Sequence, residues 1–382
     1  MKLSHGASES LEPIPLVNLK IQVAILEEKL TGVIRQVLAD GRFIGGPTVA
    51  NFEEKFARFS GAAYCVGVGN GTDALFLTLK TLGVSEGDEV ILPSHTFTAT
   101  AEAVRLVGGR PVFAEIDEAT FNIDPEDVAN KITPKTRALL PVHLYGRPAD
   151  IPSLEDLSSS YGVDLVYDAA QAHGALHRGT PIARFGRASA FSFYPGKNLG
   201  AFGDAGAVLS NDEMLANRAR MLANHGRAEK YTHELSGVNS RIDSLQAAIL
   251  SLKLDYLSEW CDARRRHATA YSELLAGFEK IRLPDLGGED IHGMHLFVIR
   301  VPAPDREGLI RYLHERKIET GIHYPIPLHM QPCNRDLGYK EGSFPVTERL
   351  VNEVLSLPMF PELTEPEIDR VSEAIKGYFG ER

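Results

Sequence analysis

Residues 189–206 read SAFSFYPGKNLGAFGDAG and contain one lysine, Lys197, between an apolar segment and a glycine-rich turn. No other Lys or Arg lies between Arg187 and Arg218. Burial disfavours the charged form of a lysine, so its pKa falls and the amine becomes a nucleophile and a base near neutral pH. For this stretch taken alone, a solvent-exposed lysine at the end of a strand is the alternative interpretation.

The preceding segment, residues 163–175 (VDLVYDAAQAHGA), favours the reactive lysine. An apolar strand ends at Asp168, and Gln171 and His173 follow it. A Schiff-base lysine and a carboxylate for a pyridinium nitrogen are the pair that pyridoxal 5'-phosphate (PLP) chemistry requires. A helix N-cap is the alternative role for Asp168. For His173, a local structural hydrogen bond is favoured over catalysis.

Composition narrows the class of protein. The chain has 382 residues, an ordinary apolar fraction and a net charge of −11, which argues against nucleic-acid binding. We expect no signal peptide, no membrane-spanning segment and no metal site. Three cysteines, an odd number without metal-ligand spacing, are typical of a reduced cytoplasmic enzyme.

From residue 62 onward, short apolar runs alternate with amphipathic segments. This alternation predicts an α/β fold in which helices flank a mostly parallel sheet. A long helical pattern over residues 240–278 is expected to link this part to a smaller α+β domain. We therefore predict a flexible N-terminus (1–13), a large cofactor-binding domain (14–255) and a small C-terminal domain (256–382).

The segment GVGNGTDAL, residues 67–75, follows a predicted strand and opens a predicted helix. Free N–H groups and the helix dipole make such a junction an anion site, where Gly71 allows close approach and Thr72 offers a hydroxyl. A dinucleotide-binding fold is the competing interpretation. The G-x-G-x-G spacing and the lack of an acidic residue after the next strand argue against it.

Five segments resemble the DegT/DnrJ/EryC1/StrS family of PLP-dependent sugar aminotransferases: GNGTDAL, PSHTFTAT, VHLYG, DAAQAHGA and SFYPGKNLGAFGDAGAV. The resemblance covers nearly the whole chain and implies the aspartate-aminotransferase-like fold (fold type I). It also implies a role for one set of residues in binding PLP: Gly71, Thr72 and Ser192 at the phosphate, Phe97, Asp168 and Gln171 at the ring, Lys197 as the Schiff-base residue, and Asn239 at the phosphate in the neighbouring subunit. The residues implied at the sugar nucleotide are Tyr194, Lys230, His323 and Tyr324.

The resemblance further implies a homodimer with shared active sites, L-glutamate as amino donor and a nucleotide-linked keto-sugar as acceptor. Tyr194 and the HYP sequence at 323–325 resemble the dTDP-3-keto-6-deoxyhexose 3-aminotransferases. A C4-acting or 3-keto-uronate aminotransferase, a PLP-dependent sugar dehydratase and a regulatory sugar-binding homologue remain as alternatives. Lys197 argues against the dehydratase, whose relatives often carry His there.

Overall fold

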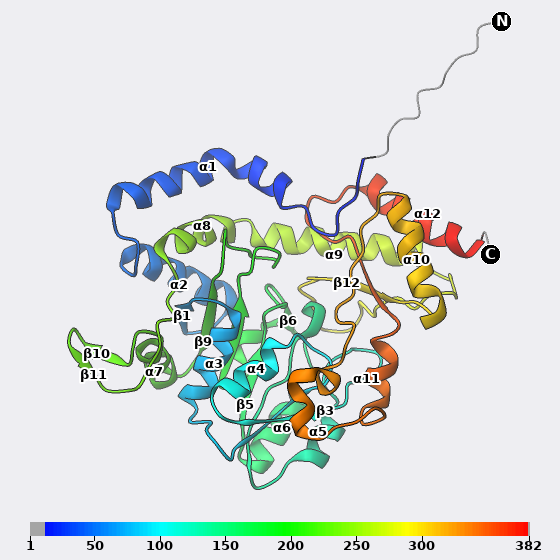
Figure 1. The fold of residues 1–382 in the computed structure, drawn as a ribbon. Coiled ribbons are helices and arrows are strands. Elements are labelled where there is room, and N and C mark those ends of the chain that lie inside the picture. The colour runs from blue at the N-terminus through cyan, green and yellow to red at the C-terminus, as the bar shows by residue number, and fades with distance from the viewer. Residues whose placement is uncertain (1–11, 381–382) are drawn as a thin grey trace, which may run out of the picture.

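The computed structural model describes residues 12–380 and is organised around a seven-stranded sheet (Figure 1). The strand order is β1-β9-β8-β5-β4-β2-β3, and β9 alone runs against its neighbours. The strands are β1 (Tyr64–Val68), β2 (Glu89–Pro93), β3 (Arg110–Ala114), β4 (Thr136–Leu139), β5 (Asp164–Asp168), β8 (Ala188–Ser192) and β9 (Gly206–Ser210). The predicted, mostly parallel sheet is confirmed.

Helices cover both faces of this sheet, each over its own apolar core. One core packs beneath α2, α6 and α8, and the other beneath α3, α4 and α7. The helices of this part are α1 (Leu19–Asp40), α2 (Pro47–Ser60), α3 (Gly71–Thr81), α4 (Ala99–Leu106), α5 (Pro125–Lys131), α6 (Ile151–Tyr161), α7 (Glu213–Ala223) and α8 (Ser244–Leu254). This is the α/β arrangement that the alternating pattern predicts, and it is consistent with fold type I, which the family resemblance implies.

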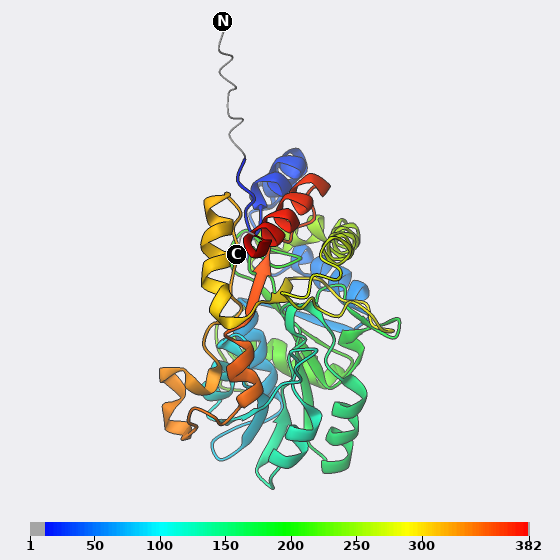
Figure 2. The same ribbon diagram turned by 90° about the vertical axis from the view of Figure 1, so that its right-hand side faces the viewer.

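A third apolar core lies in the C-terminal part of the chain. It packs between α9 (Leu257–Leu274), α10 (Ala303–Glu315), α12 (Glu365–Gly380) and the antiparallel pair β12 (Phe297–Arg300) and β13 (Val354–Leu357). Figure 2 shows α10 and α12 near each other at one end of the molecule, where the two helices are in contact. Ile14 also belongs to this core and pairs with Ile318. The domain boundaries remain a proposal, and residues 1–11 of the predicted flexible N-terminus lie outside the described residues.

The prediction of a single long helix over residues 240–278 is wrong. The chain forms two helices, α8 and α9, which are separated at Asp255 and Tyr256. Ser240 does not cap the first of them, because its hydroxyl donates to Asp73 Oδ2 at 2.7 Å and accepts from Gly69 N. These contacts tie the start of this segment to the β1–α3 junction. No helix among residues 12–380 is long and apolar enough to cross a membrane.

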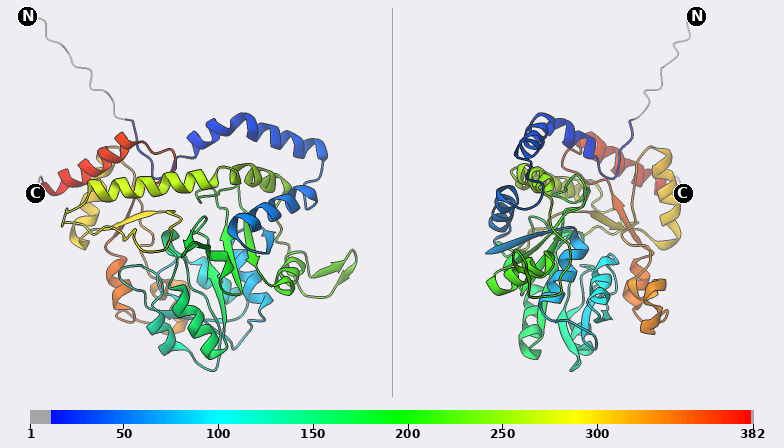
Figure 3. Two further views of the ribbon diagram at one scale, coloured as in Figure 1. Left: turned by 180° about the vertical axis from the view of Figure 1, so that it is seen from behind. Right: turned by 60° about the vertical axis from the view of Figure 1, so that its left-hand side comes forward.

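A small hairpin projects from the body beyond α7 (Figures 1 and 3). It consists of β10 (Arg227–Glu229) and β11 (Thr232–His233), and its residues are exposed. His233 Nδ1 pairs with the carbonyl of His225 at 2.8 Å, which fixes the base of the hairpin. Lys230 therefore lies on an arm that points away from its own subunit.

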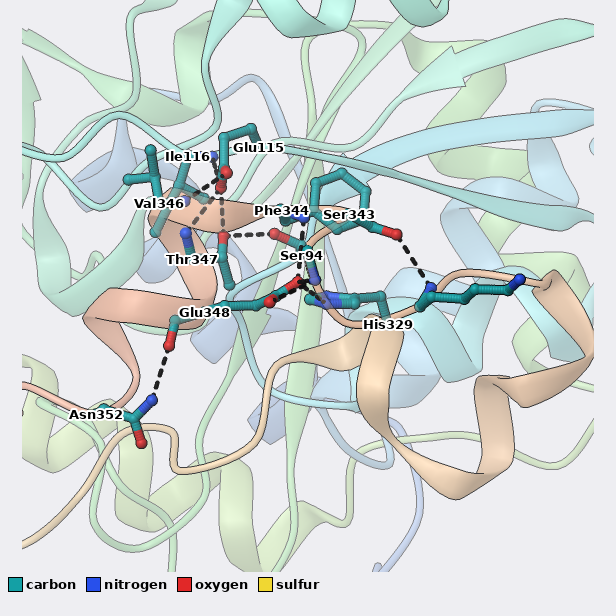
Figure 4. A network of polar contacts seen from close by, with 12 residues as sticks. Ser94, Glu115, Ile116, His329, Ser343, Phe344, Val346, Thr347, Glu348 and Asn352 are labelled. Atoms are coloured by element: carbon teal, nitrogen blue, oxygen red, sulfur yellow. Dashed lines mark hydrogen bonds and ion pairs between the residues drawn. The ribbon is translucent and has the colours of Figure 1, made fainter.

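Two carboxylates attach the short helix α11 (Pro345–Leu350) to the ends of the central strands (Figure 4). Glu115, directly after β3, accepts hydrogen bonds from the N–H groups of Val346 and Thr347 and from the Thr347 hydroxyl. Glu348 in turn accepts from His329 Nε2 at 2.9 Å. His329 thus has a structural role in this network.

The same network reaches the segment that follows β2. The Thr347 hydroxyl lies 2.6 Å from that of Ser94, and Ser94 O accepts from Leu328 N at 2.8 Å (Figure 4). The Thr347 hydroxyl donates its one proton to Glu115, so the Ser94 hydroxyl is the donor in its hydrogen bond with Thr347. The C-terminal part of the chain therefore holds the start of the segment that carries Phe97.

Candidate active site

Lys197 and Asp168 follow two neighbouring parallel strands of the sheet. Asp168 is the last residue of β5 and pairs with Ala190 of β8, and Lys197 lies in the turn after β8. Carboxyl ends of parallel strands meet at one edge of a sheet, where open α/β folds bind their ligands. Burial lowers the pKa of Lys197 to about 8, and the charge of Asp168 opposes that shift.

Asp168 is a buried carboxylate that is only partly compensated. Its two oxygens accept hydrogen bonds from the Thr100 hydroxyl at 2.8 Å and from Ala170 N at 3.1 Å. Burial nevertheless raises its pKa, although these bonds and the charge of Lys197 act in the opposite direction. The residues directly after Asp168 form turns and not a helix, so Asp168 is not a helix N-cap. A further cationic partner, such as a pyridinium nitrogen, would keep this carboxylate ionised.

The N-terminus of α3 forms a tight anion cradle against β8. Asn70 caps the helix by accepting from Asp73 N at 2.8 Å, and Gly71 and Thr72 are the first helical residues. Their N–H groups have no acceptor within the helix. A Cβ atom on Gly71 would lie 2.6 Å from Ser192 Cβ, so only glycine permits this approach. Gly71, Thr72 and Ser192 are thus brought together as predicted for a phosphate site, although their role stays a proposal.

Gln171 is fixed through both ends of its side-chain amide. Its Oε1 accepts from Tyr145 N at 2.7 Å, and its Nε2 donates to the Tyr324 hydroxyl at 3.0 Å. The ring of Tyr324 lies 5.6 Å from that of Phe97, measured between centroids. Phe97 itself is 53% exposed, as a residue that stacks on a ligand would be. The structure therefore gathers Phe97, Gln171 and Tyr324 on one side of the site.

Tyr145 and His95 belong to this site, and the sequence interpretation assigned them no role. The Tyr145 hydroxyl donates to the carbonyl of His323 and lies 2.8 Å from His95 Nε2. Since the phenol has one proton, His95 must donate from Nε2. Tyr145 adopts the left-handed conformation (φ 58°), which is strained for a residue with a side chain. Tyr145 lies in the segment VHLYG and His95 in PSHTFTAT, two of the segments that resemble the family. This resemblance was the only sign in the sequence that the two residues belong to the site.

His173 lies beneath the site and does not reach it. Its ring is buried among phenyl groups, with ring centroids 5.2 Å from Phe191 and 5.7 Å from Phe193. Burial lowers the pKa of His173 to about 3, so the imidazole is neutral. We assign it a packing role.

Two of the predicted residues stand apart from this cluster within one chain. Lys230 is exposed on the β10–β11 hairpin, and Asn239 is exposed shortly before α8. Tyr194, in contrast, is 60% exposed directly beside the lysine turn, where its carbonyl accepts from Lys197 N. His323 is held by Ser356 Oγ at 2.8 Å, and burial lowers its pKa to about 4.

These residues fit PLP. The helix start at Gly71 offers free N–H groups to an anion, Asp168 lacks a full countercharge, and no hydrogen bond or ion pair engages Lys197 Nζ among the described residues. PLP has a phosphate, a ring nitrogen and an aldehyde, and an anion site, a carboxylate and an amine lie at one edge of the sheet to match them. Groups of His, Cys, Asp and Glu that could hold a metal ion are not found among residues 12–380.

Comparison with known proteins gives consistent matches along the chain. The model of the DegT/DnrJ/EryC1/StrS aminotransferase family matches residues 24–376. The erythromycin biosynthesis sensory transduction protein EryC1 of Saccharopolyspora erythraea is 46% identical over 363 residues, which are 95% of this chain and 99% of that protein. The dTDP-3-amino-3,4,6-trideoxy-alpha-D-glucose transaminase of Streptomyces venezuelae is 44% identical, over 95% of each chain.

A solved structure agrees with the fold in detail. The crystal structure of S. venezuelae DesV in complex with a ketimine intermediate superimposes with a TM-score of 0.95 at 44% sequence identity. The match covers 97% of this chain and 100% of that one. The likeness thus extends over the sheet, the C-terminal part and the site between them.

Proposed function

Because the chain belongs to the DegT/DnrJ/EryC1/StrS aminotransferase family, and is thus a PLP-dependent sugar aminotransferase, we propose that it aminates C3 of a dTDP-linked 3-keto-6-deoxyhexose with L-glutamate as donor. One observation carries this proposal. An amine with a lowered pKa, Lys197, and a buried carboxylate, Asp168, follow adjacent parallel strands beside an anion cradle at Gly71. The named S. venezuelae relative supports the choice of sugar.

Bound PLP supplies an electron-accepting ring through which an amino group can pass from donor to acceptor. Lys197 would hold the cofactor and, when released, carry a proton on Nζ to and from the neighbouring carbon. Its pKa of about 8 leaves part of the amine unprotonated near neutral pH, as a general base requires. Asp168, oriented by Thr100, would hold a proton on the ring nitrogen.

Other residues would bind and orient. Gly71, Thr72 and Ser192 would take the phosphate, and Phe97 would cover the ring. The Gln171 amide has a second N–H to offer beyond the one bound to Tyr324. Tyr194, His323 and Tyr324 border the open side of the site, and we assign them to the sugar nucleotide.

A homodimer is part of this proposal. The helix α1 and several loops expose a set of large apolar side chains: Leu19, Ile21, Val23, Ile25, Leu38, Phe43, Ile44, Phe202 and Val238. The inner face of α1 packs on α8 through Leu26 and Leu30. Exposed large apolar side chains in this number support a protein–protein interface, since monomeric proteins rarely expose large apolar patches. Phe43 O also accepts from Ser244 N, which links the surface to α8 and the segment of Asn239.

Subunit hybrids test whether Asn239 acts on the partner's site. We expect Lys197→Ala and Asn239→Ala proteins, when mixed and allowed to exchange, to gain activity above both parents. In each hybrid one site carries both defects and the other carries neither, because a two-fold axis pairs each Lys197 with the partner's Asn239. Turnover is measured before and after exchange, and subunit exchange is confirmed by mass spectrometry. Confirmed exchange without a gain would show that Asn239 acts within its own subunit.

The regiochemistry gives a direct test of the proposed substrate. With L-glutamate, the enzyme is expected to aminate dTDP-3-keto-6-deoxyhexose and to leave the 4-keto isomer unchanged. Tyr194 offers a phenol hydroxyl that can orient a sugar oxygen, whereas C4-acting relatives often carry His at this position, and an imidazole can change its charge near neutral pH. NMR of the product identifies the aminated carbon. A product aminated only at C4 would overturn the C3 assignment and leave the aminotransferase assignment intact.

The name of the S. erythraea relative contains the words "sensory transduction", so a sensory or regulatory role is the second candidate function. The assembled set of Lys197, Asp168, Gln171 and Ser192 argues for catalysis, since a regulator that had lost its cofactor would not need to retain all four. A cytoplasmic location remains a proposal that rests on three free cysteines.

A further inference from the structure

Lys253 on α8 is a buried ammonium group that the mechanism above does not use. Lys253 is only 2% exposed, and its Nζ donates a hydrogen bond to the carbonyl of Gly200. Nζ also lies 5.3 Å from the ring centroid of Phe202 and 6.0 Å from that of Trp260. Burial lowers the pKa of Lys253 to about 8, and the charge of Glu362 opposes this shift only in part.

The carbonyl that Lys253 binds is part of the turn that carries Lys197. Gly200 stands three residues after Lys197, and a Cβ atom there would lie 2.2 Å from the carbonyl oxygen of Pro195. The turn is closed by hydrogen bonds from Lys197 N to Tyr194 O and from Ala201 N to Phe193 O, both 2.8 Å. Such a tight turn transmits a displacement of Gly200 to Lys197.

A second side chain of α8 holds the next part of the same loop. Gln246 stands seven residues before Lys253, two turns earlier on the same face of the helix. Its Oε1 accepts from Phe202 N at 2.8 Å, and its Nε2 donates to Phe202 O at 3.1 Å. One helix face therefore fixes the peptide groups on both sides of Ala201.

Packing alone does not account for a cation at position 253. Burying an ammonium group without a carboxylate partner costs free energy, which one carbonyl and two aromatic faces offset only in part. A methionine would fill a similar volume without that cost. What methionine would lack is a charge-assisted hydrogen bond, which is about twice as strong as a neutral one, to the Gly200 carbonyl.

We propose that Lys253, together with Gln246, is a positioning residue that sets the orientation and burial of Lys197 by holding the loop 195–202 against α8. The inference rests on the proposed function only for the role of Lys197. The titratable groups that act on or are acted on by Lys197 are Asp168, His173, His295 and His323. Burial lowers the pKa of all three histidines, so Asp168 is the charged member of that set.

The test uses Lys253→Met in the full-length enzyme. A loosened loop admits water to Lys197, so its pKa rises toward the ordinary value. We expect the pH profile for the reaction of the apoenzyme with PLP, followed by the visible absorption band, to move upward by about 0.5 unit or more. We also expect kcat to fall about tenfold or more with KM within about threefold, as misplacement of a reacting group predicts.

Gln246→Ala and Lys55→Met complete the design. Gln246 is partly exposed, so its variant is expected to fold and to shift the profile in the same direction by less. Lys55 binds the C-terminal end of α8 at Ser251 O and the following Asp255, and among the described residues it has no hydrogen bond to the loop, so Lys55→Met should leave profile and turnover unchanged.

Two outcomes would overturn the inference. One is a wild-type pH profile and kcat in folded Lys253→Met, even with a lower melting temperature, since that result would show a purely structural role. If Lys253→Met fails to fold, an unchanged profile in Gln246→Ala has the same meaning. Failure of the wild-type protein to bind PLP at Lys197 would instead refute the proposed function, so the two failures are distinguishable.

Discussion

Lys197→Ala is expected to abolish transamination and to remove the visible absorption band of bound PLP. In the proposed mechanism this amine attaches the cofactor and moves the proton, and no other lysine or arginine lies between Arg187 and Arg218 to replace it. Loss of both roles should lower kcat by about 10⁴-fold or more. Absorbance spectra of the purified variant and a coupled transamination assay measure the two effects.

Lys80→Ala is a matched control for this variant. Lys80 is an exposed lysine in the last turn of α3, and its removal should change neither spectrum nor turnover. Full turnover in Lys197→Ala would exclude Lys197 as the reactive amine. Weak PLP binding with no band is compatible with the assignment, because the phosphate cradle at Gly71 remains.

Asp168→Asn is expected to keep the fold and to lose nearly all activity. A neutral amide cannot hold a proton on the ring nitrogen, and the protonated ring is what stabilises a carbanion. We expect kcat to fall by about 10³-fold, in the range that loss of a single electrostatic contact in an active site produces. Stability should change little, because the pKa of Asp168 is already raised by burial and its charge is costly to the fold.

The matched control is Asp164→Asn on the same strand. Asp164 begins β5 at the opposite end from Asp168 and forms an ion pair with Arg187. We expect turnover to be unaffected there. Thermal unfolding and the spectrum of bound PLP accompany the kinetic measurement, and normal turnover of folded Asp168→Asn would mean that Asp168 has no role at the ring.

Local sequence was sufficient to predict the sheet and to predict that the main residues of the proposed site lie at one edge of it. Each of the seven central strands was indicated by a short apolar run, since strands buried on both faces have little alternation. Lys197 and Asp168 could be placed together because each follows such a run, and the carboxyl ends of parallel strands share one edge. Gly71 could be identified since a strand–helix junction leaves free N–H groups wherever it occurs.

The break between α8 and α9 was not predictable from pattern. Residues 240–278 keep their helical spacing through Asp255 and Tyr256, and neither residue is a strong helix breaker. The Ser240 hydroxyl bonds to Asp73, 167 residues earlier in the chain, and no local pattern indicates that contact.

The sequence by itself indicated how strands and helices alternate along the chain, and it predicted the reactive lysine, its carboxylate and the anion site, because each of these depends on neighbours a few residues apart. Only the tertiary structure decided how these groups are held. Tyr145 and His323 are 178 residues apart, Ser94 and Thr347 are 253 apart, and Lys253 is 53 residues from Gly200. Hydrogen bonds of this kind depend on distance and angle between separately folded segments, and no local pattern encodes that geometry.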